Sequence, residues 1–190
     1  PGYEADDLIG TLVTSGREKG IPSTIVSRDK DLAQLISRQD VFWDFAGKGQ
    51  LSYEQIPEVF GVWPEQIADF LALAGDAVDN IPGVPGVGKK TAAALLQHFG
   101  SLQEIYANLD RVHEVTVRGA RSLGAKLELH RPAAMLARQL TGIACDAPVA
   151  NPAYGLRPQF PQLGAINALF DSANFGMALR RQAERVADLH

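Results

Sequence analysis

The stretch GDAVDNIPGVPGVGKKT, residues 75–91, decides how this chain is interpreted. It opens with two carboxylates, Asp76 and Asp79, and continues as a turn rich in glycine that leads into a helix with two lysines at its start. Glycines let a backbone approach a phosphate closely, and a helix N-terminus offers free N–H groups and the positive end of the helix dipole. We therefore expect the turn to bind the phosphates of a long substrate. The residues expected to bind are Gly83, Gly86, Gly88, Lys89, Lys90 and Thr91.

Two structural alternatives apply to this turn. A nucleotide-binding P-loop is excluded, because the pattern G-x-x-x-x-G-K-[ST] is not met and Lys90 stands where Ser or Thr is required. A plain glycine turn between two packed helices is the other alternative. The two lysines and the paired prolines, Pro82 and Pro85, weigh against it.

Two further acidic clusters lie upstream of Asp76 and Asp79. Each cluster alone is explained by helix capping, since Asp and Glu are common at helix N-termini, and Asp76 and Asp79 alone suit a turn. Three doubled clusters that converge at one edge of a sheet are not explained in this way. The upstream acids are Glu4, Asp6 and Asp7 in GYEADD, and Asp29 and Asp31 in SRDKD.

Gathered carboxylates repel one another, and each raises the pKa of its neighbours unless cations neutralise them. The single cysteine, Cys145, leaves no Cys/His set for zinc, so hard ions with oxygen ligands fit best, namely Mg²⁺ or Mn²⁺. Two such ions about 4 Å apart activate a water and stabilise the leaving oxygen of a phosphodiester. The acids therefore predict a phosphodiester hydrolase.

Hydrophobic periodicity predicts an α/β fold at the start of the chain. The spacing predicts a helix over residues 4–18, a buried strand over 23–27, a helix from Leu32 and a second strand over 41–45 before a turn. Alternation of helix and strand is typical of a parallel sheet, and function in such sheets gathers beyond the carboxyl ends of the strands. Two strands are too few for a complete sheet, so we expect an upstream part to be missing.

The rest of the chain is expected to be helical, apart from one connector. A helix over 64–74 opens with Pro64, and helices follow from residue 87 to 140; four prolines predict an extended connector over 147–161, with helix again over 162–187. The expected division is a metal-binding α/β core at 1–80, a helical phosphate-binding subdomain at 81–140, and a connector with helices that pack back on the core at 141–190.

The charge is divided along the chain in a way that the net charge of -4 conceals. Residues 1–80 carry 14 Asp and Glu against 6 Lys and Arg, whereas residues 81–140 carry 4 against 8. An acidic, metal-binding part thus adjoins a basic, phosphate-binding part. No apolar run is long enough for a membrane span, and one cysteine excludes an internal disulfide and fits a reducing compartment.

Together these residues resemble the 5′-nuclease family, which includes flap endonucleases and the 5′-3′ exonuclease domain of bacterial DNA polymerase I. The resemblance is carried by PGYEADDLIGTL, by SRDKDLAQLI, by the stretch LALAGDAVDNIPGVPGVGKKTAAALLQHFGSLQEIYANLD, and more loosely by the chain from RGARSLGAKLELHR to its end. It implies the C-terminal part of a PIN-like parallel-sheet nuclease domain, followed by a helix-hairpin-helix subdomain of the H3TH type.

The resemblance also implies a function and a site. The activity is cleavage near the 5′ end or flap of branched duplex DNA by two Mg²⁺ or Mn²⁺ ions, in a bacterial cytoplasmic protein, and the helix-hairpin-helix turn is expected to hold K⁺. Family members carry further aspartates and a helical arch upstream of GYEADD, so we expect a partial active site that an N-terminal segment or a second polypeptide completes. The metal ligands implied are Glu4, Asp6, Asp7, Asp29, Asp31, Asp76 and Asp79, all but Asp7 catalytic.

Two alternatives to a nuclease remain. A structure-specific DNA-binding module without catalytic activity would keep the glycine turn and the lysines. A phosphatase or a signalling receiver would need a nucleophilic aspartate at the end of a strand, and nothing else in the sequence supports it.

Overall fold

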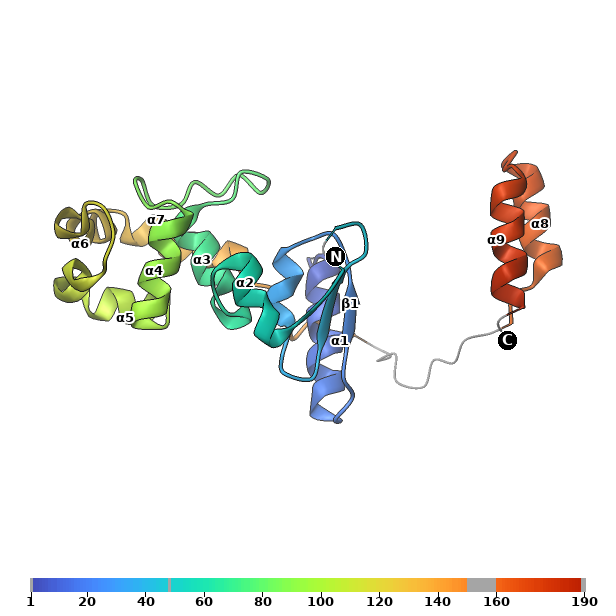
Figure 1. The fold of residues 1–190 in the computed structure, drawn as a ribbon, viewed down its shortest axis with the longest axis horizontal. Coiled ribbons are helices and arrows are strands. Elements are labelled where there is room, and N and C mark those ends of the chain that lie inside the picture. Colours follow the sequence, from blue (N-terminus) through green and yellow to red (C-terminus); the bar gives the residue numbers. More distant parts are fainter. Residues whose placement is uncertain (1, 48, 150–159, 189–190) are drawn as a thin grey trace. The chain divides into compact units, whose positions relative to one another are not determined.

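The computed structural model describes residues 2–47, 49–149 and 160–188, and it divides into two compact units, residues 1–152 and 153–190. The first unit contains a small sheet and most of the helices, and the second unit contains two helices (Figure 1). The secondary structure of the first unit runs α1 (Ala5–Glu18), β1 (Thr24–Val26), η1 (Asp31–Leu35), β2 (Val41–Asp44), β3 (Gly49–Ser52), η2 (Tyr53–Gln55), α2 (Ile56–Phe60), η3 (Pro64–Gln66), α3 (Ile67–Ala74), α4 (Lys89–Phe99), α5 (Leu102–Ala107), η4 (Leu109–Glu114), α6 (Ala120–Leu129) and α7 (Arg131–Thr141), where η denotes a 3₁₀ helix.

The sheet has three strands in the order β1-β2-β3. β1 and β2 are parallel, as expected, and their register places Ile25 beside Phe42. β3 was not expected. It pairs antiparallel with β2 and places Leu51 on the other side of Phe42. Period-2 alternation buries these three side chains on one face of the sheet, where they join the core.

The expected helix from Leu32 is a 3₁₀ helix, η1, and this prediction was wrong in type. η1 ends at Leu35, because Ile36 has an extended backbone. The carboxylate of Asp40 then accepts the backbone N–H of Ser37 and stabilises the turn that leads into β2. Leu32, Ala33 and Leu35 are still buried, so the apolar spacing that suggested a helix serves the core through a shorter element.

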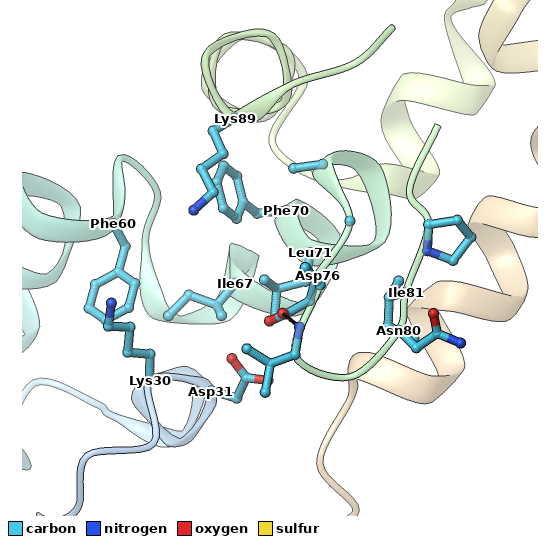
Figure 2. Close-up of a pocket in the computed structure, with 15 residues that line it drawn as sticks. Lys30, Asp31, Phe60, Ile67, Phe70, Leu71, Asp76, Asn80, Ile81 and Lys89 are labelled. Carbon is cyan, nitrogen blue, oxygen red and sulfur yellow. Dashed lines mark hydrogen bonds between the residues drawn. The ribbon is translucent and has the colours of Figure 1, made fainter. Parts of the chain in front are cut away.

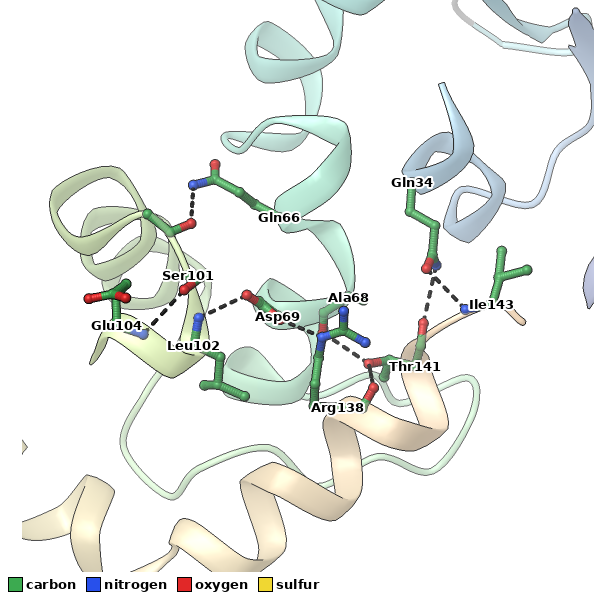
Figure 3. Close-up of polar contacts among 11 residues, drawn as sticks. Gln34, Gln66, Ala68, Asp69, Ser101, Leu102, Glu104, Arg138, Thr141 and Ile143 are labelled. Atoms are coloured by element: carbon green, nitrogen blue, oxygen red, sulfur yellow. Dashed lines mark hydrogen bonds and ion pairs between the residues drawn. The ribbon is translucent and has the colours of Figure 1, made fainter. Parts of the chain in front are cut away.

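Helix α3 connects the sheet to the helical part through polar side chains as well as through apolar ones (Figure 3). Asp69 forms an ion pair with Arg138 of α7 and accepts a bond from the backbone N–H of Leu102, while the Thr141 hydroxyl donates to the carbonyl of Ala68 at 2.9 Å. Gln66 donates to two carbonyls at the end of α4. These bonds fix α4, α5 and α7 around α3.

One hydrophobic cluster extends through the first unit, from Val13 and Ile25 to Leu127 and Ala137. The sheet and the helices from α4 to α7 therefore share a core. The segment after α7 returns along α1, where the backbone N–H of Ala144 donates to Asp7 at 2.9 Å.

The second unit is a helical hairpin, α8 (Leu163–Ser172) and α9 (Met177–Ala187). The turn between them passes through Asn174, whose φ of 54° is in the left-handed region. Arg180 joins the two helices through an ion pair with Asp171 at 2.6 Å. Most of the connector expected over 147–161 lies outside the described residues.

Candidate metal centre and nucleic-acid interface

Three of the predicted acids lie together in the structure. One carboxylate oxygen from each of Asp31, Asp76 and Asp79 lies within 4.8 Å of those of the other two. Asp31 is the first residue of η1, just beyond the carboxyl end of β1, and the other two acids lie in the loop after α3. Among the residues that the structure describes, no other group of three possible ligands is as close.

The loop that carries Asp76 and Asp79 is fixed to the end of α3 by glycines. Gly75 and Gly83 both have φ in the left-handed region, 81° and 66°, and they lie so close that a Cβ at residue 83 would be 2.5 Å from the nitrogen of Gly75. Asp76 and Ile81 exchange two backbone hydrogen bonds of 2.9 and 2.7 Å across the loop. Any side chain at Gly83 would therefore push the acidic loop away from α3.

Hydrogen bonds orient two of the acids. Oδ1 of Asp76 accepts the backbone N–H of Val78 at 2.7 Å. Oδ1 of Asp29 accepts the backbone N–H of Asp31 at 3.0 Å, so Asp29 fixes the start of η1. The carboxylate of Asp31 accepts no hydrogen bond within residues 2–47, 49–149 and 160–188.

The electrostatics of the cluster are those of unneutralised acids. Burial, followed by the charges of Asp29, Asp76, Asp79 and Asp6, raises the pKa of Asp31 to about 6. Burial, followed by the charges of Asp29, Glu4, Asp7 and Asp79, also raises the pKa of Asp6. Asp6 and Asp29 thus contribute to the same field as the three clustered acids, although their oxygens lie outside the 4.8 Å group.

The remaining predicted ligands, Glu4 and Asp7, lie at the start of α1. Glu4 is the N-cap residue and is exposed. Both oxygens of Asp7 are used within the fold, since one accepts the backbone N–H of Glu4 at 3.0 Å and the other accepts that of Ala144 at 2.9 Å. Asp7 therefore joins α1 to the segment after α7.

The glycine turn and the lysines form a second, adjacent surface. Gly86 has a φ of 83°, Gly88 is the N-cap residue of α4, and Lys89 and Lys90 are the first residues of the helix. Both lysines are exposed, and neither forms an ion pair within the described ranges. Thr91 is half-buried one residue further on.

Two lysines with no sequence-based role also belong to this region. Nζ of Lys126, on α6, lies 3.4 Å from the position that a Cβ at Gly86 would take. Lys30 lies between Asp29 and Asp31 and lines the same cavity as Lys89. Ion pairing distinguishes these two lysines from other basic residues. Arg111, Arg131 and Arg138 are neutralised by acids. Lys30 and Lys126 form no ion pair in the described part of the chain.

A cavity of about 720 Å³ connects the acidic cluster to the start of α4 (Figure 2). Asp31 and Asp76 line it together with Lys30 and Lys89, and its wall includes Phe60 and other apolar side chains. Two of the three clustered acids and one candidate phosphate ligand therefore face the same space.

Comparison with known proteins identifies the family. The family model described as 5′-3′ exonuclease, C-terminal SAM fold, matches residues 62–163, and the model of the N-terminal resolvase-like domain matches residues 1–61. The chain belongs to the 5′-3′ exonuclease family. This confirms the resemblance found in the sequence.

Two curated relatives show how much of the family proteins this chain spans. DNA polymerase I of Pseudomonas aeruginosa is 46% identical over 175 residues, which are 92% of this chain and 19% of the polymerase. A 5′-3′ exonuclease of Buchnera aphidicola from Schizaphis graminum is 39% identical over 148 residues, 78% of this chain and 52% of the relative.

Solved structures confirm the fold. T5 5′-exonuclease with bound divalent metal ions (zinc) aligns over 98% of this chain and 60% of its own, with a TM-score of 0.64 and 20% identity. The catalytic core of Rad2 in complex with DNA substrate aligns over 96% of this chain and 60% of its own, with a TM-score of 0.57 and 15% identity.

One expectation needs correction. We expected the N-terminal part of the nuclease domain to be absent, but the model of the N-terminal resolvase-like domain matches residues 1–61. As for a membrane, the described residues contain no helix with the length and apolarity to span one.

Proposed function

We propose that this 5′-3′ exonuclease family chain hydrolyses DNA phosphodiesters with two divalent ions, Mg²⁺ or Mn²⁺, at the acidic cluster. The proposal rests mainly on one observation: the oxygens of Asp31, Asp76 and Asp79 lie within 4.8 Å of one another beside a cavity that Lys89 also lines. We include Glu4, Asp6 and Asp29 as further acids of the site, and we assign Asp7 to the fold because both its oxygens are used.

The residues present fit hard divalent cations. The clustered donors are all carboxylates. Burial, followed by the repulsion of the neighbouring acids, raises the pKa of Asp31, because no cation in the described chain neutralises it. Bound ions would lower the pKa of a water and stabilise the oxygen that leaves the phosphorus. The protein's own contribution is to hold the three carboxylates in place through Gly75, Gly83 and the bonds between Asp76 and Ile81.

The glycine turn binds the duplex part of the substrate in this proposal. Gly83, Gly86 and Gly88 bring the backbone close to phosphates, while Lys89, Lys90 and Lys126 supply charge that acids of the described chain do not neutralise. We propose that carbonyls of the same turn hold K⁺, and that the preferred DNA is branched with a 5′ flap. The Rad2 core solved with DNA substrate supports DNA as the class of ligand.

Cleavage of a labelled 5′-flap DNA tests the activity. We expect cleavage with Mg²⁺ or Mn²⁺, none with EDTA, and a loss of at least 100-fold in Asp76→Asn, since divalent-ion catalysis supplies several kcal/mol of the rate enhancement. Asp110→Asn, which changes an exposed acid of η4, is the matched control and should cleave like the unchanged protein. DNA binding that persists in EDTA, without cleavage in any metal, would instead favour a non-catalytic structure-specific binding module.

The salt dependence of duplex binding tests separately whether the glycine turn and its lysines bind the DNA phosphates. Replacing both Lys89 and Lys90 by Ala should lower the slope of log K against log salt by about 2, since each lost phosphate contact removes about 0.9. The double variant Arg111→Ala/Arg131→Ala removes two cations that are already paired with Glu114 and Glu128, so its slope should change by less than half as much. Equal changes of the slope in the two double variants would mean that the turn is not the phosphate-binding site.

A further inference from the structure

The cavity beside the metal centre has a wall that the metal chemistry does not use. Lys30 and Lys89 line it with the rings of Phe60 and Phe70, and a neighbouring cavity of about 400 Å³ is lined by the same four side chains. The four residues therefore form the boundary that the two cavities share. Figure 2 shows Lys89 and Phe70 above Phe60 and Lys30 on the left side of the view, with Asp31 to the right of Lys30.

The two ammonium groups in this wall lack acidic partners. Lys30 and Lys89 are exposed and form no ion pair with any described residue, even though Lys30 lies between two aspartates in the sequence. Lys90, the neighbour of Lys89, lines neither cavity. Two cations from different elements, the turn before η1 and the start of α4, thus converge on one space, and neither forms an ion pair with Asp31 or Asp76, which line the same cavity.

The combination of cations and aromatic rings narrows the class of ligand. A duplex backbone alone needs only cations, and an apolar ligand needs only the rings. A nucleotide unit has both requirements, because its phosphate is an anion and its base presents a flat face that stacks on aromatic side chains. Phe60 is half-buried at the end of α2, so part of its ring remains accessible.

We propose that Lys30, Lys89 and Phe60 form a subsite for the nucleotide next to the phosphodiester that lies at the acidic cluster. The two ammonium groups bind its phosphate, and the ring of Phe60 packs against its base. This inference rests on the proposed function, since the acidic cluster must first position the strand. It adds a positioning role for Lys30 and separates the role of Lys89, which faces the cavity, from that of Lys90.

Binding of modified 5′-flap DNA tests the phosphate contact. Affinity is measured by fluorescence anisotropy in Ca²⁺, with one phosphate at a time replaced by a neutral methylphosphonate along the strand that would be cut. At one position next to the scissile phosphodiester, the substitution should cost about tenfold, the effect of one charge-assisted contact. Lys30→Ala should lower the affinity for unmodified DNA by a similar factor. On DNA with the methylphosphonate at that position, the affinity of Lys30→Ala should be less than twofold below its affinity for unmodified DNA.

The base contact is tested by the same design. Phe60→Leu keeps an apolar side chain in the core and should weaken binding of unmodified DNA about fivefold, within the range for stacking of one base. On DNA with an abasic nucleotide at the identified position, Phe60→Leu and the unchanged protein should bind with the same affinity. Arg111→Ala, whose cation is paired with Glu114, is the control and should show no such coupling. Thermal unfolding of each variant confirms that it is folded.

The outcomes separate the inference from the proposed function. If unmodified DNA binds but the effects of Lys30→Ala and of every methylphosphonate are additive, the subsite is wrong and the proposed function stands. If the full chain binds no flap DNA at all, the proposed function fails and the subsite with it. Coupling to a methylphosphonate several nucleotides from the scissile position would also overturn the subsite as placed here.

Discussion

Two aspartates of the α/β part, Asp40 and Asp31, show opposite ways of placing an acid in a fold. Asp40 is 1% exposed and accepts hydrogen bonds from Arg17, from the hydroxyl and N–H of Ser37 and from the N–H of Ser23. Burial alone would raise its pKa, but these bonds lower it below the ordinary value. Asp31 has acids around it in place of donors, and burial followed by the charges of these acids raises its pKa to about 6.

The difference teaches which acids the fold needs. Asp40 stabilises the native state, because its donors compensate for the loss of water. Asp31 destabilises the native state in the absence of a cation, and a protein gains from such an arrangement only when something else neutralises it. Carboxylates that cluster with few hydrogen-bond donors around them are therefore the better indicator of a site than the number of acids in a sequence segment.

The largest expected effect comes from removing the satisfied acid. Asp40→Ala leaves the guanidinium of Arg17 and three other donors without their acceptor, and we expect unfolding in urea to show a loss of about 3 kcal/mol. Glu18→Ala, at the exposed end of α1, is the control and should change stability by less than about 0.5 kcal/mol. A loss below about 1 kcal/mol in Asp40→Ala would remove the contrast with Asp31.

The next effect is on the pH dependence of metal binding. Because the pKa of Asp31 is raised to about 6, the group is ionised at pH 7 and mostly protonated at pH 5, and a proton must leave before a cation binds. Mn²⁺ affinity measured by calorimetry should therefore fall about tenfold from pH 7 to pH 5, equal to about 1.4 kcal/mol. An acid with an ordinary pKa would give almost no change over this range, so a flat profile would contradict the assignment.

A smaller effect, of opposite sign, is expected when Asp31 itself is replaced. The pKa of Asp31 is higher in the folded state than the ordinary value of 3.8, so wild-type stability is lost as the pH rises from about 4 to about 6. In EDTA at pH 7, Asp31→Asn should be about 1 kcal/mol more stable than wild type, since partial exposure reduces the full effect of the shift. The gain should vanish at pH 4, where both side chains are neutral.

Asp31→Asn should also lose the stabilisation that a bound metal ion gives to the folded protein. Mn²⁺ at 100 times its dissociation constant stabilises a folded protein by about 2.7 kcal/mol, and thermal unfolding of wild type should show this gain. Asp31→Asn should show little of it. An unchanged response to Mn²⁺ would mean that the three clustered acids are not the metal ligands.

Much of the fold could be predicted from local patterns. The apolar spacing of α1 and the β-branched run of β1 are signals within one element, and the structure has both within one residue of the expected bounds. β3 could not be predicted, because GQLS contains one apolar residue and becomes a strand only through its pairing with β2. The 3₁₀ form of η1 depends in the same way on the return of the chain at Asp40.

The candidate site also has residues that local sequence signals indicate and residues that only the structure reveals. Doubled acids at a strand end and after a helix indicated Asp31, Asp76 and Asp79, whose convergence the structure shows. The roles proposed for Lys30 and Lys126 could not be found in the sequence, since a lysine that forms an ion pair and one that does not look alike there. Their signal is the absence of an ion pair combined with a position on the cavity or beside Gly86, and both need coordinates.

The smallest expected effect tests two neighbouring acids, Asp6 and Asp7, against each other. The change to Asn removes the same charge from adjacent positions, so long-range electrostatic effects on metal binding should be similar. The oxygens of Asp7 already accept the N–H groups of Glu4 and Ala144, whereas the pKa of Asp6 is raised by burial and by Asp29. In a Mn²⁺ titration, Asp7→Asn should change the dissociation constant by less than about twofold, or about 0.4 kcal/mol. Asp6→Asn should weaken binding several-fold more than Asp7→Asn, and equal losses would return Asp7 to the set of metal ligands.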